Sequence, residues 1–161
     1  MLSLQRTFLG LRKLPSRRGW LESVSYIALV IVVAVVIAPS IIEINQRPPL
    51  GELVRVGAIA FFIPSLVEEV VFRGLLLPKV TLPWVLLSLS AYVLWHPVEA
   101  LTFLPEAASV FFNFQFLFVV AVLGALCTVA YLRTGSLWAS VFIHWGVVVA
   151  WKAVGGGGFF V

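Results

Sequence analysis

The chain has 161 residues, of which 61% are hydrophobic and 11% are charged, and its formal net charge is +4. A soluble domain of this length is far more polar, so the composition excludes that class and predicts an all-α, polytopic transmembrane bundle of about five membrane-embedded helices. The positive charge gathers in a basic N-terminal segment, which suits contact with the anionic lipid of a bilayer better than contact with nucleic acid: Arg6, Arg12, Lys13, Arg17 and Arg18.

Residues 1–19 are expected to form a short amphipathic helix on the membrane surface. Apolar residues recur there at spacings of three or four, which is the pattern of an interfacial helix: Leu4, Phe8, Leu11 and Leu14. The following apolar stretch, about Trp20 to Ile42, is long enough to span the membrane and lacks a convincing signal-peptide cleavage site. We therefore predict that it is a retained first span, with Trp20 at the interface.

The second predicted span follows a polar turn at residues 43–52 and runs from about Leu53 to Leu77. Pro64 interrupts this span one turn before Glu68. Because proline removes a backbone hydrogen bond, we expect a kink that widens the bundle beside Glu68.

A third apolar run, from about Trp84 to His96, is short for a full crossing. Pro97 follows it and biases His96 out of helical geometry. Residues 97–108 are therefore expected to form a loop or an interfacial segment.

The last two predicted spans are clearer. The fourth runs from about Ser109 to Leu132, and the fifth begins at Ser136 and runs to about Val154. Ser136 is expected to act as the N-cap of the fifth span.

These elements divide the chain into a basic cytoplasmic or interfacial segment at 1–19, one transmembrane helical domain at 20–154 and a flexible glycine-rich tail at 155–161. The single cysteine, Cys127, lies in an apolar run. An intrachain disulfide is therefore impossible, and we expect a small buried side chain.

The charged residues of the loops predict the orientation of this multi-pass protein. With the N-terminus in the cytoplasm, seven basic residues fall on the cytoplasmic side: Arg6, Arg12, Lys13, Arg17, Arg18, Lys79 and Arg133. The outer side then carries only Arg47, Arg55 and Lys152. The positive-inside rule favours this arrangement.

Three ionisable residues, Glu68, Glu69 and Arg73, lie inside the second span, where burying a charge is costly and marks a functional site by default. Glu69 and Arg73 are four residues apart, so they share a helix face and are expected to pair. Glu68 is rotated from Glu69 by about 100° and is left for another partner. The alternative is a purely structural ion pair with a spare carboxylate at a helix end.

The two histidines, His96 and His144, both lie in apolar runs. Either one alone is explained by a hydrogen bond between helices. Together with the two glutamates they are nearly all the proton-transferring groups within the bilayer. At about 1.5 Å of rise per residue, Glu68 and His144 each lie roughly 12–14 Å from the cytoplasmic ends of their spans, so their side chains can meet. His96 lies about 18 Å from the cytoplasmic end of its run, which matches the depth of the other two residues less well.

A buried carboxylate with two imidazoles is equipped to activate water and to stabilise an oxyanion. A nucleophilic hydrolase is disfavoured, because no serine has a GxSxG context and Cys127 has no histidine near it in the sequence. Zinc held by Glu68, His96 and His144 stays open as an alternative, although no HExxH motif is present.

Three motifs in order resemble the CAAX-protease and bacteriocin-processing family (CPBP, also called Abi) of intramembrane endopeptidases. The family's EExxxR motif matches Glu68 to Arg73, and its aromatic residue four positions before a histidine matches Tyr92 and His96. The segment that leads up to and includes the family's last histidine matches residues 135–144. The resemblance covers residues 64–148.

The resemblance implies a membrane-embedded hydrolase that cleaves a membrane-associated protein or peptide by glutamate-activated water, without a cofactor. It implies that Glu68 activates water with help from His96, and that His144 stabilises the oxyanion. Glu69 and Arg73 would shape the site.

One position departs from the family pattern. The family often has an asparagine four residues after its last histidine, as a second oxyanion donor, and here that residue is Val148. Asn113 could replace it only if the bundle brings it near.

Two other functions remain open from the sequence. A catalytically weak relative that acts as a membrane adaptor or immunity-type protein is favoured by Val148 and opposed by the intact glutamates and histidines. A small transporter or proton relay would also bury such residues, but the paired broken helices of internal repeats are missing. Nothing in the chain reports recognition of a prenyl group.

Overall fold

The computed structural model describes residues 2–41 and 48–154. Within these ranges every regular element is a helix, joined to the next by short turns, and there is no strand. Four helical stretches are long and apolar enough to cross a membrane, and α8 is a shorter apolar helix. The predicted all-α, polytopic bundle is therefore confirmed. The predicted flexible tail at 155–161 and the first half of the polar turn at 43–52 lie outside the described residues.

The first two helices are α1 (Leu2–Arg12) and α2 (Arg17–Ile37). The α2 helix begins three residues before the predicted Trp20, because Ser16 acts as the N-cap and its side chain accepts a hydrogen bond from the Gly19 N–H. The helix also ends earlier than predicted, since Pro39 cannot continue it and begins the short 3₁₀ turn η1 (Pro39–Ile41).

The second crossing consists of four short helices: α3 (Leu50–Ala60), the π-helix η3 (Phe61–Leu66), α4 (Val67–Glu69) and the π-helix η4 (Val70–Leu75). The backbone leaves helical geometry at Ile63, with φ −130° and ψ 116°, immediately before Pro64. Proline forces the residue before it toward extended geometry. The predicted interruption beside Glu68 is therefore confirmed.

The third crossing, α5 (Leu82–Thr102), corrects the prediction that His96 ends a helix and that 97–108 is a loop. The helix continues past Pro97 because stopping there would expose further unpaired backbone groups in an apolar environment, whereas proline lacks only one N–H. Two short helices follow, η5 (Pro105–Ala107) and α6 (Ala108–Phe111).

The last two helices are α7 (Phe114–Thr134) and α8 (Leu137–Ala153). The α7 helix begins later than the predicted Ser109, because Asn113 is its N-cap and accepts from two backbone N–H groups. The predicted N-cap of α8 is confirmed, since the Ser136 side chain accepts a hydrogen bond from the Trp138 N–H. Between the helices Gly135 adopts a φ of 67°, which glycine permits without strain.

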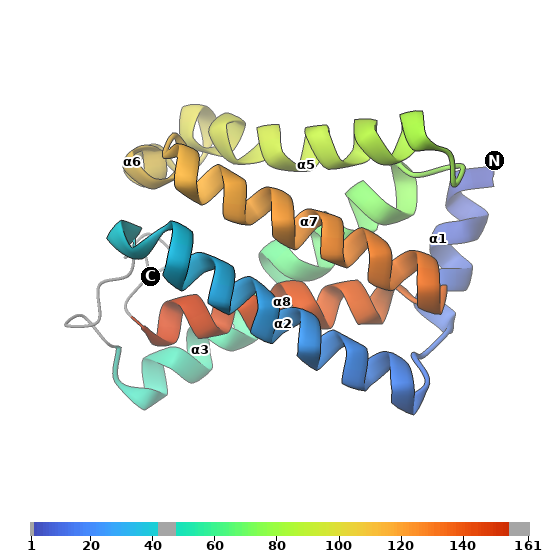
Figure 1. The fold of residues 1–161 in the computed structure, drawn as a ribbon, viewed down its shortest axis with the longest axis horizontal. Helices are drawn as coiled ribbons and strands as arrows, with labels where there is room; N and C mark the ends of the chain where they lie inside the picture. Colours follow the sequence, from blue (N-terminus) through green and yellow to red (C-terminus); the bar gives the residue numbers. More distant parts are fainter. Residues whose placement is uncertain (1, 42–47, 155–161) are drawn as a thin grey trace.

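The helices α2, α7 and α8 pack against one another, with α5 against α7 and α3 against α8 (Figure 1). Their shared core contains Val30 from α2, Cys127 from α7 and Ile143 from α8, all without exposed surface. The expectation that Cys127 is a small buried side chain is confirmed.

The N-terminal helix α1 packs directly on the bundle as well as carrying basic charge. A Cβ atom at Gly74 would lie 2.8 Å from two side-chain atoms of Thr7, so glycine permits the close contact of η4 with α1. Two further hydrogen bonds hold α1 in place: Arg6 donates to the Pro78 carbonyl at 3.0 Å, and the Trp138 indole donates to the Leu11 carbonyl at 2.7 Å.

Candidate active site

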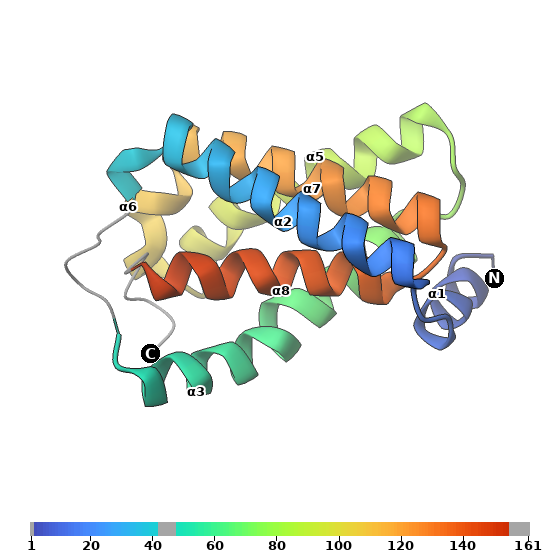
Figure 2. The same cartoon turned by 60° about the horizontal axis from the view of Figure 1, so that its bottom comes forward.

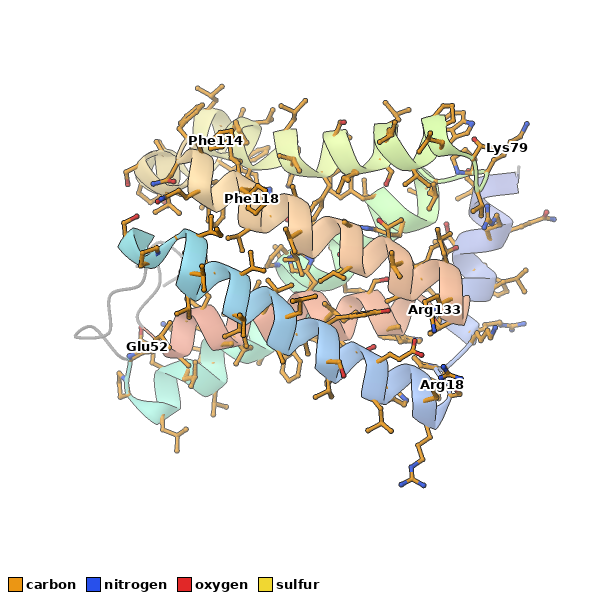
Figure 3. The ribbon with its side chains drawn as sticks, viewed as in Figure 1. Arg18, Glu52, Lys79, Phe114, Phe118 and Arg133 are labelled. Atoms are coloured by element: carbon orange, nitrogen blue, oxygen red, sulfur yellow. The ribbon has the colours of Figure 1, made fainter. Side chains whose placement is uncertain are left out.

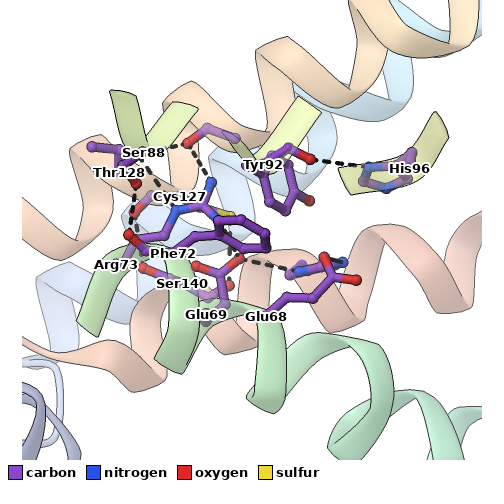
Figure 4. Close-up of polar contacts among 12 residues, drawn as sticks. Glu68, Glu69, Phe72, Arg73, Ser88, Tyr92, His96, Cys127, Thr128 and Ser140 are labelled. Atoms are coloured by element: carbon purple, nitrogen blue, oxygen red, sulfur yellow. Dashed lines mark hydrogen bonds and ion pairs between the residues drawn. The ribbon is translucent and has the colours of Figure 1, made fainter. Parts of the chain in front are cut away.

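The three charged residues of the second crossing are buried in the middle of the bundle. Glu69 and Arg73 have no exposed surface, and Glu68 is 5% exposed. The guanidinium Nη1 of Arg73 donates to Oε1 of Glu69 at 3.0 Å, so the predicted ion pair is present (Figure 4). A buried pair of this kind persists only when its remaining polar atoms also find partners.

Arg73 finds those partners on α7. Its Nη2 donates to the Gly124 carbonyl at 2.8 Å, and its Nε lies 3.5 Å from the Thr128 hydroxyl oxygen. The guanidinium also lies 4.2 Å from the centre of the Tyr92 ring, an arrangement that stabilises a cation. Gly124 makes this packing possible, because a Cβ there would lie 2.7 Å from the Tyr92 ring.

His144 contacts both glutamates. Its Nδ1 lies 3.1 Å from Oε1 of Glu69, and its Nε2 lies 3.9 Å from Oε2 of Glu68. One oxygen of Glu69 therefore serves both Arg73 and His144, a contact that the helical spacing alone does not predict. This shared oxygen fixes the orientation of the imidazole and turns the opposite ring nitrogen toward Glu68.

His96 joins the same region from α5. Its Nδ1 lies 3.2 Å from the Tyr92 carbonyl oxygen, and its ring packs edge-on against Phe111 and Phe116 at centroid distances of 5.2 and 5.6 Å. The depth count left the position of His96 open, and the bundle brings it to the same cavity as Glu68 and His144.

That cavity has a volume of about 520 Å³. Its polar lining comes from five side chains, and the rest of its wall is apolar: Glu68, Tyr92, His96, Glu99 and His144. Glu69 and Arg73 lie behind this wall and support it. Among the described residues, no hydrogen-bond partner is present for Glu68 Oε2 or for the Tyr92 hydroxyl, although both atoms are buried.

Two members of this lining were not assigned a role from the sequence. Tyr92 entered only as a motif position, and Glu99 falls within the predicted loop at 97–108. Since α5 continues through Pro97, Glu99 falls one turn beyond His96 and reaches the cavity. The spacing of three residues between His96 and Glu99 would have signalled this if the helix had been extended.

The two positions considered for the second oxyanion donor lie apart. Val148 lines the cavity one turn after His144, as expected from their spacing. Asn113 instead caps α7, and its Oδ1 accepts from the N–H groups of Gln115 and Phe116 at 2.8 and 3.3 Å. The bundle therefore does not bring Asn113 to the cavity as a replacement donor.

Metal binding was the sequence alternative for Glu68, His96 and His144. Within the ranges 2–41 and 48–154, no three or more His, Cys, Asp or Glu side chains are grouped to hold a metal ion. The cavity wall presents two carboxylates, Glu68 and Glu99, and the two imidazoles, a set that can take and return protons.

Comparison with known proteins identifies a family. A family model described as type II CAAX prenyl endopeptidase Rce1-like matches residues 50–150. The match includes all five residues predicted for the site: Glu68, Glu69, Arg73, His96 and His144. No curated protein and no solved structure gives a significant match.

Replacing Glu69 with glutamine is expected to destabilise the protein strongly, by about 3–5 kcal/mol, because the charge of Arg73 stays buried without its counter-ion. Thermal unfolding in detergent would measure this. The matched control is Glu22→Gln, which weakens surface ion pairs with Arg18 and Arg133 and should cost at most about 1 kcal/mol. Equal unfolding temperatures for the two variants would contradict the supporting role of Glu69.

Proposed function

Because the chain belongs to the Rce1-like family of type II CAAX prenyl endopeptidases, we propose that its cavity hydrolyses a peptide bond by glutamate-activated water. Membership of this family, with several apolar helices, makes the chain an integral membrane protein of a CAAX-type protease family. The mechanism, the substrate and the roles of individual residues are the proposal.

The position of Glu68 carries the proposal. Of the two adjacent glutamates, only Glu68 lines the cavity, and its Oε2 lacks a hydrogen-bond partner among the described residues. Glu69 engages Arg73 and His144 through Oε1, and although its Oε2 also lacks a partner among the described residues, Glu69 does not line the cavity. A carboxylate that faces a cavity with a free oxygen is placed to accept a proton from a water molecule.

The reaction proceeds in two steps. In the first, Glu68 accepts a proton from water as the water oxygen bonds to the scissile carbonyl carbon, and His96 helps to orient that water. The resulting oxyanion receives a hydrogen bond from His144. In the second step the oxyanion collapses, the carbon–nitrogen bond breaks, and Glu68 returns its proton to the leaving amine.

The substrate that suits this site is a membrane-associated protein or peptide. The cavity wall is apolar apart from the five polar side chains, and an apolar wall binds apolar residues next to the scissile bond. The family description names prenylated CAAX substrates. For this chain the proposal is limited to a peptide presented within the membrane.

The second candidate function is that of a catalytically weak relative that acts as a membrane adaptor or immunity-type protein. The observation that favours it is Val148, which presents an apolar side chain to the cavity where the family pattern has an amide. Activity measurements on wild type separate the two functions.

Glu68→Gln is expected to lower the rate of cleavage at least about a hundredfold, because glutamine cannot accept the proton from water. Cleavage of a membrane peptide library by protein reconstituted in liposomes would measure this. Glu106→Gln, a change at an exposed glutamate outside the cavity lining, is the control and should cleave as wild type does. Equal cleavage by wild type and Glu68→Gln would exclude the proposed mechanism.

Activity is expected to survive dialysis against a strong chelator, because the proposed mechanism needs no metal. Elemental analysis of the same active preparation tests the zinc alternative. One zinc per chain, lost together with activity and restored with it, would instead make Glu68, His96 and His144 metal ligands.

A further inference from the structure

The two ends of the bundle differ in charge. Among the described residues, one end carries seven basic side chains against one acidic side chain, Glu22: Arg6, Arg12, Lys13, Arg17, Arg18, Lys79 and Arg133. The opposite end carries a nearly balanced set: Glu52, Arg55, Glu99, Glu106 and Lys152. Figure 3 shows Arg18, Lys79 and Arg133 at one end and Glu52 at the other. The charge-balanced end is called the opposite end below.

The cavity lies in the half of the bundle toward the opposite end. Most of its lining residues belong to the second halves of α2, α5 and α8 and to the first half of α7, and these halves meet because α7 is antiparallel to the other three helices. Pro64 and Glu68 of the second crossing and Phe111 of α6 also line it. Toward the opposite end α2 and α8 diverge (Figure 2), and residues of both helices line the cavity there, among them Val35 and Val148. The cavity reaches the surface there, since its lining includes Val35, which is 55% exposed.

The basic end is closed by packing. Leu77 and Leu137 have no exposed surface and form a cluster with Tyr131, which is 4% exposed. Helix α1 covers this cluster, with Leu11 packed against it and Thr7 packed against Gly74. A polypeptide cannot reach Glu68 from this end without displacing α1.

We infer that substrate enters the cavity from the non-cytoplasmic side of the membrane, as an apolar polypeptide segment in the outer half of the bilayer. The basic end faces the cytoplasm by the positive-inside rule, so the N-terminus is cytoplasmic and the opening between α2 and α8 faces outward. That the entering segment is a substrate rests on the proposed function. The side from which it enters rests on the distribution of charge and on the packing at the basic end.

Cysteine labelling tests this orientation. Val154→Cys places a thiol in the cavity lining, at the C-terminal end of α8. Phe103→Cys is a second probe of the same end, at a side chain that is 70% exposed, and Leu14→Cys probes the basic end at a side chain that is 69% exposed. Wild type is the blank, because its single thiol at Cys127 has no exposed surface.

The probe is a charged, membrane-impermeant maleimide applied to right-side-out and inside-out vesicles of a bacterial inner membrane. Val154→Cys and Phe103→Cys should be labelled only in right-side-out vesicles, and Leu14→Cys only in inside-out vesicles. Labelling of Val154→Cys in inside-out vesicles, or in neither kind, would overturn the inference. If wild type shows no cleavage while the labelling is as expected, the proposed function is contradicted and the orientation still holds.

A second observation concerns the missing oxyanion donor beside His144. With Val148 in the cavity wall and Asn113 at the cap of α7, neither position supplies an amide there. Tyr92 is fully buried, lines the same cavity and has a hydroxyl without a hydrogen-bond partner among the described residues. Its ring packs edge-on to His144 at a centroid distance of 5.8 Å.

The Tyr92 ring is held firmly without using its hydroxyl. The Arg73 guanidinium covers one face of the ring. Phe72 and His96 pack edge-on at 5.3 and 5.5 Å between centroids. A rigid ring with an unpaired donor is a preorganised group of the kind that stabilises developing charge. Leaving such a hydroxyl unpaired costs stability, a cost that catalysis would explain.

We propose that the Tyr92 hydroxyl donates the second hydrogen bond to the oxyanion, together with His144. This proposal rests on the proposed function and adds a catalytic residue to it. The hydroxyl keeps its proton, so the two-step reaction stays balanced.

Tyr92→Phe tests the proposal because it keeps the ring and removes the hydroxyl alone. We expect kcat to fall about a hundredfold or more with little change in KM, and the unfolding temperature to stay the same or rise. Val148→Asn in the Tyr92→Phe background should restore part of the loss. The control is Tyr131→Phe, which lies outside the cavity and should leave kcat unchanged.

An unchanged kcat in Tyr92→Phe would overturn this assignment. So would a fall in kcat that follows a fall in the unfolding temperature, because that result indicates a structural role. Glu68→Gln separates the outcomes, since its full activity would reject the hydrolytic mechanism itself rather than the role of Tyr92.

Discussion

The constraint on which this bundle depends is the burial of a full positive charge at Arg73. An isolated charge in an apolar bundle is prohibitively costly, so the guanidinium must be satisfied on several sides at once. The Glu69 carboxylate, the Gly124 carbonyl and the Tyr92 ring meet this need from three directions. In doing so they fix η4 against α5 and α7, and they place Glu68 on the wall of the cavity.

Local rules were enough to predict the features that depend on neighbours in the sequence. The interruption before Pro64, the N-cap Ser136 and the pairing of Glu69 with Arg73 all follow from spacings of one to four residues. The overall class follows from composition, because a chain this apolar has to be embedded in a membrane. Pro97 shows the limit of such rules, since the surroundings of α5 decide whether a proline ends a helix.

The contacts between distant segments could not be predicted in the same way. His144 meets Glu69 across 75 positions of sequence, and no periodicity encodes that distance. Asn113 was considered as a cavity residue on chemistry alone, and its place at the start of α7 makes it a cap instead. Tyr92 belongs to a motif, but only the packed structure shows that its hydroxyl lacks a partner and that its ring lies between Arg73 and the two histidines.

A single oxygen atom, Oε1 of Glu69, joins the ion pair that holds the fold to the imidazole that faces the cavity. Rigidity and turnover therefore cannot be adjusted independently at this point. Few substitutions would be tolerated in the residues that surround Arg73. Lipid-facing positions such as Val32 and Val36, which are 58% and 68% exposed, are free to vary. Substitutions intended to raise the stability of the protein should therefore be placed first on that outer surface, far from Oε1 of Glu69.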